Sequence, residues 1–258
     1  MGFVRGFLAP FRGALFIAQQ RLWRYLLLPL LINIGLALAT LWGAAIFLRQ
    51  EFDGMIRSTP VLGWIGLVAI TGVLGAVLFI VLQPVLGAIF NDRLSARVET
   101  QVRGKAAEAP FLLSTGQAIG HGLLKLLLYA VALVIGMVLT TLTGIGSVIG
   151  LGLGAIFLAY DGFDFPLSRR GKGFAAKWGY LGRHPAMALG FGVGATVLYF
   201  IPLAFVVAPP FAAAGATLVF LDADARAEAR AARRAQRAQL KAARRAGAAS
   251  QKSTAPSP

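Results

Sequence analysis

The sequence predicts an all-α integral membrane protein, and three observations lead to this fold class. Of the 258 residues, 57% are hydrophobic and 14% are charged, whereas soluble domains typically carry about 25% charged residues. The mean hydropathy is +0.73. All charges lie outside four uncharged runs, at residues 25–48, 61–91, 126–160 and 186–221. Each run exceeds the roughly 20 residues that a transmembrane helix needs.

The N-terminal segment, residues 1–20, is predicted to form an amphipathic helix at the membrane interface. Phe3, Phe7 and Phe11 recur at a spacing of four, and Arg5 and Arg12 lie seven residues apart on another face. This pattern is typical of helices that lie in the interface plane. A secretory signal peptide fits less well, because Arg12 interrupts the apolar core that such a peptide requires.

The first two uncharged runs have the length of single spans. Residues 25–48 and 61–91 are therefore predicted to cross the membrane as helices. The segment between them, residues 49–60, is a short polar connection with no net charge. Residues 92–125 return to water with five basic residues.

The last two uncharged runs, of 35 and 36 residues, do not fit single spans. One helix of this length would be about 52 Å long, against a hydrocarbon core of about 30 Å, and two spans would receive only about 17 residues each. Neither run offers a polar turn. We therefore expect two re-entrant helical hairpins, at residues 126–160 and 186–221, with tips near Gly144, Gly146 and Ser147 and near Pro202.

The distribution of basic residues predicts the orientation. Basic segments precede the first span, follow the second span, lie between the hairpins and form the tail, whereas only residues 49–60 are neutral. If basic segments stay in the cytoplasm, both termini are cytoplasmic and only the first two runs cross. Residues 168–182, between the hairpins, are predicted to form a second interfacial amphipathic helix.

The chain is expected to comprise a membrane domain, residues 1–221, and a basic tail, residues 222–258. The tail is predicted to be helical to residue 246, resting on anionic lipid, and disordered afterwards. The net charge of +15 does not indicate nucleic acid, because the basic residues flank apolar segments as the positive-inside rule requires.

Residues 22–34, which read LWRYLLLPLLINI, resemble the CysZ family of bacterial sulfate permeases, to which eukaryotic etoposide-induced membrane proteins are more distantly related. The acidic segment 160–166 and the last hairpin, 201–217, are also similar to that family. The resemblance covers residues 2–222. It implies an oligomeric inner-membrane permease for sulfate or a related oxyanion, with two transmembrane helices and two hemi-penetrating hairpins.

The resemblance also implies an anion site at the start of the first span. The family uses two consecutive arginines and the backbone just before them. Here Arg24 matches the second arginine, Trp23 stands at the first, Leu22 precedes them, and Arg21 stands at a family glycine. The alternative for Arg24 is a topology anchor whose guanidinium reaches lipid headgroups.

Other candidate residues have structural alternatives. The hairpin tips could line an ion path or only make tight turns, and the glycine ladders indicate close helix packing. We expect Asp161 and Asp164 to pair with Arg169 or Arg170, with proton coupling as the alternative. The chain has no cysteine and no recognisable catalytic or metal-binding motif, so we expect no enzyme, cofactor or metal site. The alternative function is a non-transporting membrane adaptor or envelope assembly protein that acts through the tail.

Overall fold

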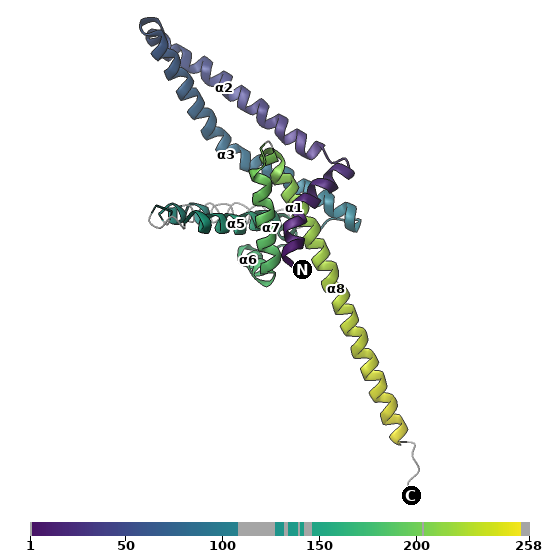
Figure 1. Cartoon of the computed structure of the whole chain (residues 1–258). Coiled ribbons are helices and arrows are strands. Elements are labelled where there is room, and N and C mark those ends of the chain that lie inside the picture. Colours follow the sequence, from purple (N-terminus) through teal and green to yellow (C-terminus); the bar gives the residue numbers. More distant parts are fainter. Residues whose placement is uncertain are drawn as a thin grey trace. The chain divides into compact units, whose positions relative to one another are not determined.

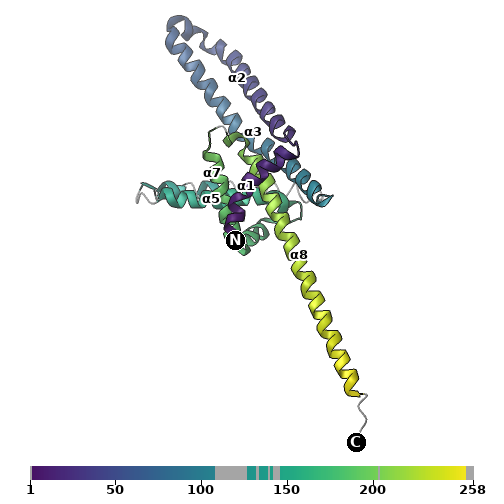
Figure 2. The same cartoon turned by 45° about the vertical axis from the view of Figure 1, so that its right-hand side comes forward.

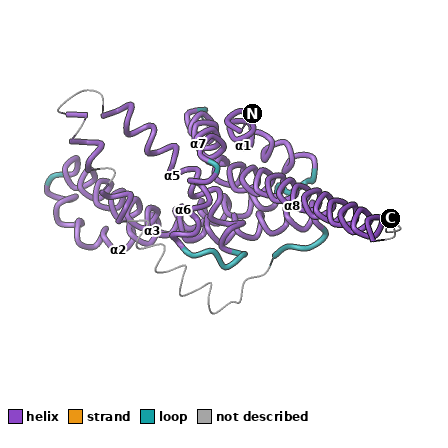
Figure 3. The backbone as a smooth tube through the Cα atoms, turned by 90° about the horizontal axis from the view of Figure 1, so that it is seen from below, coloured by secondary structure: helices purple, strands orange, loops and turns teal. Residues whose placement is uncertain are grey.

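The computed structural model describes residues 2–107, 127–131, 134–138, 140–141, 146–202 and 204–253. Within these residues every regular element is a helix (Figure 3), which confirms the predicted all-α class. The chain divides into two compact units, Met1–Leu218 and Val219–Pro258.

The helices are labelled in Figure 1. They are α1 (Gly2–Gln19), α2 (Arg24–Ser58), α3 (Pro60–Arg103), α5 (Gly146–Ser168), α6 (Phe174–Arg183), α7 (Pro185–Phe200) and α8 (Ala204–Ser253).

Helices α2 and α3 lie side by side as one long hairpin (Figures 1 and 2). Only Thr59 separates them, so most of the predicted polar connection is helical. An exposed ion pair of 2.7 Å between Arg57 and Asp53 lies in the last turns of α2. At its other end α3 stops at Gly104, whose φ of 81° is the left-handed conformation that commonly ends a helix.

The two helices of this hairpin expose many large apolar side chains, including Leu31, Leu38, Trp42, Val61 and Val68. Trp42 alone is 73% exposed. Soluble monomers rarely expose contiguous apolar surface on this scale. The surface suits a hydrocarbon environment, as expected for a membrane protein.

Two helices in the described residues are long and apolar enough to cross a membrane, Arg24–Gly43 and Val148–Ser168. The first agrees with the predicted span at residues 25–48. The second begins within the first predicted re-entrant hairpin. The described part of the other predicted span contains only a shorter apolar segment, Pro60–Gly75. Length and composition therefore support the first predicted span, whereas the span at residues 61–91 and the two re-entrant hairpins stay predictions.

Helix α1 packs against α7 through glycines. A Cβ atom on Gly6 would collide with the carbonyl oxygen of Met187, and one on Gly190 or Gly194 would collide with the backbone of Phe3 or Phe7. The two backbones therefore approach closely, as small residues at helix interfaces allow. Close helix packing is thus confirmed for the glycine ladder of Gly190 and Gly194, but not for Gly150 and Gly154 of the other ladder, which have open space around them in the described structure.

The small residues of α1 face inward, and several of its large apolar residues face outward, although Ile17 is buried. Ala9 and Pro10 are buried, whereas Val4 and Leu15 are largely exposed. The outward face supplies an apolar surface for the interfacial position that the sequence predicts.

The chain breaks at Ile201 and Pro202 between α7 and α8, and both residues are exposed. Helix α8 then continues to Ser253. Residues 247–253, which were expected to be disordered, are thus helical. Their composition explains the difference, since alanine, glutamine and lysine are strong helix formers.

Candidate functional site

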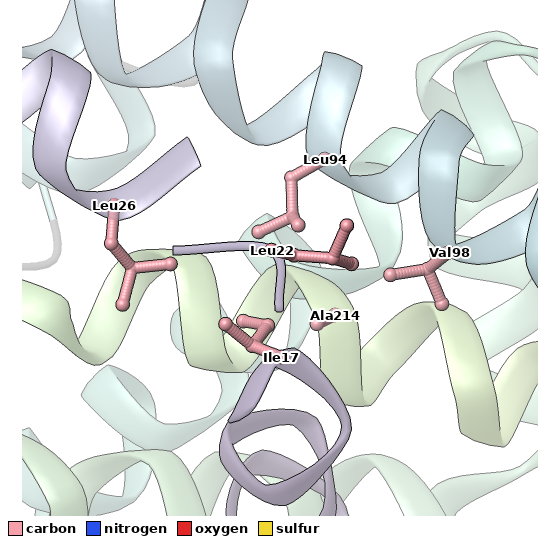
Figure 4. Packing of buried hydrophobic residues seen from close by; sticks show 6 residues of the cluster. All are labelled: Ile17, Leu22, Leu26, Leu94, Val98 and Ala214. Carbon is pink, nitrogen blue, oxygen red and sulfur yellow. The ribbon is translucent and has the colours of Figure 1, made fainter. Parts of the chain in front are cut away.

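The α1–α2 corner, residues 20–24, is held by a buried leucine. Leu22 is 4% exposed and packs in a hydrophobic cluster that joins four helices. Figure 4 shows Leu22 surrounded by the other cluster members, which are Ile17, Leu26, Leu94, Val98 and Ala214. The corner is thereby fixed on α3 and on the first turns of α8.

Two backbone N–H groups of the corner have no backbone acceptor among the described residues. Arg21 adopts a left-handed φ of 54°, and the Leu22 N–H donates to the Ile17 carbonyl at 3.0 Å. In the described part of the chain, the N–H groups of Trp23 and Arg24 donate to no backbone carbonyl. Such unsatisfied N–H groups at a helix start attract anions.

The side chains of the corner are cationic and accessible. The Arg24 guanidinium lies 5.1 Å from the centre of the Tyr25 ring, and its Nη2 donates to the Tyr25 hydroxyl at 3.4 Å. Trp23 is 45% exposed. Among the described residues, no carboxylate forms an ion pair with Arg21 or Arg24. The corner therefore offers positive charge and directed N–H groups, which together suit an oxyanion.

The four predicted corner residues have different positions in this arrangement. Arg21, Trp23 and Arg24 are exposed, whereas the Leu22 side chain and N–H are both engaged within the protein. Leu22 can therefore contribute by anchoring the corner, and not by donating a hydrogen bond to an anion.

A second polar centre, the ionic cluster, lies where α3, α5 and α6 meet. Arg169 Nη1 contacts Asp92 Oδ1 at 2.7 Å and Arg169 Nε contacts Glu99 Oε2 at 3.5 Å. Arg170 Nη2 donates to Glu99 Oε1 at 2.6 Å. Glu99 is only 2% exposed. Its charge is thus balanced by two arginines from the end of α5.

The remaining pair of the cluster joins α5 to α6. Lys177 Nζ contacts Asp164 Oδ1 at 2.5 Å and donates to Ser168 Oγ at 2.7 Å. For Asp164 this partner differs from the predicted pairing with Arg169 or Arg170. Asp164 and Arg169 are five residues apart, a spacing that does not place side chains on one helix face. Asp161 is half-buried one turn earlier.

Two hydroxyl groups extend the ionic cluster to α8. Arg169 Nη2 donates to Ser95 Oγ at 2.6 Å, and Ser95 Oγ lies 2.5 Å from Thr217 Oγ1. Thr217 in turn donates to the Ala213 carbonyl. The ionic cluster thus comprises three acidic and three basic side chains, which are Asp92, Glu99, Asp164, Arg169, Arg170 and Lys177. Buried charges are costly unless they are paired, so the equal numbers favour their burial.

Sequence reasoning missed the α3 members of the cluster. Asp92, Ser95 and Glu99 lie at i, i+3 and i+7, so they share one face of α3. A polar face at the end of an otherwise apolar helix is the sequence pattern that could have revealed them. Leu94 and Val98 occupy the adjacent face and contact the corner. The same turns of α3 therefore support both polar centres.

The predicted hairpin-tip residues are only partly described. Gly146 begins α5 and is buried, Ser147 follows it in that helix, and Gly144 lies outside the described residues. None of the hydrogen bonds or ion pairs above involves Gly146 or Pro202. In the described ranges no group of three His, Cys, Asp or Glu side chains could hold a metal ion.

Comparison with known proteins gives one finding. Residues 9–210 match the profile of a family described as sulfate transporter CysZ/etoposide-induced protein 2.4. The search of curated proteins gives no match. The matched range contains the α1–α2 corner and all six charged residues of the ionic cluster, and it ends before the basic tail.

Proposed function

Because the chain belongs to the family of the sulfate transporter CysZ and etoposide-induced protein 2.4, as its motifs predicted, we propose that it is a permease for sulfate or a related oxyanion. The family is named for a transporter and not for an enzyme. The proposed flux runs down the gradient of the anion.

The observation that carries the proposal is the geometry of the α1–α2 corner within the matched range. Arg24 provides a guanidinium held against Tyr25, and the N–H groups of Trp23 and Arg24 lie beside it without backbone partners. A planar guanidinium donates paired hydrogen bonds to a tetrahedral oxyanion. Arg21 can supply a second positive charge in place of the family arginine at position 23.

The proposed topology follows the charge distribution. The protein lies in the bacterial inner membrane with both termini in the cytoplasm, two spanning helices and two re-entrant hairpins. Non-helical backbone at membrane depth must be covered by protein or line a wet cavity. We therefore propose a homo-oligomer in which neighbouring copies help to cover the hairpin tips.

Sulfate flux in proteoliposomes tests the proposal. We expect uptake above that of protein-free liposomes, and we expect Arg24→Ala to lower it at least about tenfold, since one charged hydrogen-bonding group is worth about 1.5–3 kcal/mol. Arg57→Ala is the matched control, because Arg57 is an exposed arginine near the other end of α2. Equal flux in the Arg24→Ala protein and the parent would remove the proposed site.

Arg24→Lys separates the anion site from the topology anchor. Lysine reaches headgroups as well as arginine does, but it lacks the planar fork that binds an oxyanion through two bonds. We expect Arg24→Lys to insert in the parent orientation and to transport poorly. Full transport by the Arg24→Lys protein would favour the alternative in which Arg24 is only a topology anchor.

The exposed basic tail favours the alternative function of a membrane adaptor or envelope assembly protein. Deletion of residues 222–258 distinguishes the permease from the adaptor. A permease should keep its sulfate flux without the tail, whereas an adaptor should lose its cellular role while the membrane domain remains folded.

A further inference from the structure

The part of α8 from residue 222 to residue 253, here called the tail helix, contains an 11-residue repeat. Residues 226–236 read RAEARAARRAQ and residues 237–247 read RAQLKAARRAG. Seven of the eleven positions are identical, and an arginine pairs with a lysine at an eighth. An 11-residue period corresponds to about 3.67 residues per turn, close to the pitch of the α-helix.

This period places the basic residues on one straight stripe. At about 100° per residue, eight basic residues fall within an arc of about 120°, over a length of about 28 Å. They are Arg226, Arg230, Arg233, Arg234, Arg237, Lys241, Arg244 and Arg245. The opposite face is formed mainly by alanines, among them Ala231, Ala235 and Ala242.

From Arg226 to Lys241 the charge of the stripe is exposed, and the stripe has few acidic neighbours in the sequence. All residues from Arg226 to Lys241 are exposed. Arg226 lies 3.9 Å from Asp222, one turn earlier, and no acidic residue follows Glu228 in the sequence. The stripe therefore presents a dense line of positive charge without internal neutralisation beyond its first turns.

We propose that the tail helix is a docking surface for the anionic headgroups of the bilayer that holds the membrane domain. A straight stripe can contact a negatively charged plane along its whole length, whereas the phosphate backbone of a duplex curves away from a straight helix. The tail also has no aromatic residue, so it has nothing on which the bases of a single strand could stack. Because the tail helix continues from the apolar start of α8, a bilayer surface is always within its reach.

The chemistry of the tail helix makes this docking electrostatic. Leu240 is its one large apolar residue, so the tail helix lacks the apolar face with which amphipathic helices insert between lipids. Attraction between surface charges weakens as the Debye length falls, from about 10 Å at 0.1 M salt to about 3 Å at 1 M. Docking should therefore need anionic lipid and reverse at high salt.

Energy transfer in the full-length protein tests the proposal independently of transport. The chain has no cysteine, so Gln239→Cys on the alanine face gives a single site for a donor dye. The protein is placed in nanodiscs whose headgroups carry an acceptor dye. We expect transfer to be at least threefold higher with one-third phosphatidylglycerol than with phosphatidylcholine alone at 0.1 M salt, and the difference to vanish at 1 M. Equal transfer in the two lipids would overturn the proposal.

Two quadruple variants assign the effect to the stripe. The first replaces four basic residues by glutamine: Arg233→Gln, Arg234→Gln, Arg237→Gln and Lys241→Gln. The control makes four substitutions to glutamine on the opposite face: Ala231→Gln, Ala235→Gln, Ala242→Gln and Ala243→Gln. We expect the first variant to lose the lipid-dependent transfer and the control to keep it. Equal behaviour of the two variants would contradict docking through the stripe.

Nucleic acid is the competing partner in the same assay. Duplex RNA at 0.15 M salt should leave the transfer in anionic nanodiscs unchanged. Release of the tail helix by RNA at micromolar concentration would show that nucleic acid is preferred and would overturn the proposal.

Discussion

Glu99→Gln is predicted to destabilise the membrane domain strongly. Glu99 is 2% exposed and lies 2.6 Å from Arg170 and 3.5 Å from Arg169. The substitution keeps the shape of the side chain but removes its charge. Arg170 then loses its charged contact with Glu99, whereas Arg169 keeps its contact with Asp92.

The expected magnitude follows from the burial of this group. Removing one partner of a buried ion pair costs about 3–5 kcal/mol, because the other charge is left uncompensated. A unit of the size of Met1–Leu218 loses about 2–4 °C in Tm per kcal/mol. Glu99→Gln should therefore lower the Tm by about 6–20 °C.

The assay is the amount of monodisperse protein that remains after heating in detergent. Asp53→Asn is the matched control, because it removes a carboxylate from an ion pair of 2.7 Å whose side chains are 48% and 79% exposed. Exposed pairs contribute about 0–1 kcal/mol, so this variant should melt close to the parent.

A double variant tests the reason for the loss. Adding Arg170→Gln to Glu99→Gln also removes the positive charge that faced Glu99, so it should restore part of the lost Tm. A Glu99→Gln protein that melts within 2 °C of the Asp53→Asn control, about the shift expected for 1 kcal/mol or less, would refute the account of the ionic cluster.

Three further predictions follow from the packing and can be checked by the same melting assay. Gly192→Ala should lower stability by about 1–3 kcal/mol, because its Cβ would collide with the Ala155 carbonyl. The control Gly150→Ala has open space around it and should be neutral or stabilising. Similar losses in both variants would contradict the close contact between α5 and α7. Arg21→Gly should raise stability by up to about 1–2 kcal/mol, since φ is 54° there, and a lower Tm would argue against this conformation. Leu22→Ala should cost about 2–5 kcal/mol, and a loss below 1 kcal/mol would show that the corner is not anchored by this side chain.

The helical fold was predictable because it depends on local composition. Uncharged runs of more than 20 residues indicate helices in a bilayer. The break at Pro202 follows because proline lacks the backbone N–H that a continuous helix needs. The end of α8 was less predictable, since alanine-rich sequence continues a helix beyond the Gly247 that suggests a stop.

The partners of the charged residues were not predictable, because they depend on distant contacts. The sequence places Asp164 close to Arg169 and Arg170, but the structure pairs the two arginines with Asp92 and Glu99, about 70 residues earlier. Arg24 was identifiable from the motif in which it lies. The free N–H groups at Trp23 and Arg24 depend on how the chain turns at the corner, and composition does not specify that turn.

The most direct test of the central claim is the position of a bound oxyanion. Selenate has the tetrahedral shape of sulfate and a strong anomalous signal, so crystals grown with selenate can locate it. We predict an anomalous peak for selenium at the α1–α2 corner. The selenate oxygens should lie about 2.7–3.2 Å from the nitrogens of the Arg24 guanidinium and of the Trp23 and Arg24 N–H groups. Selenate bound elsewhere in the protein, with no peak at the α1–α2 corner, would contradict the account.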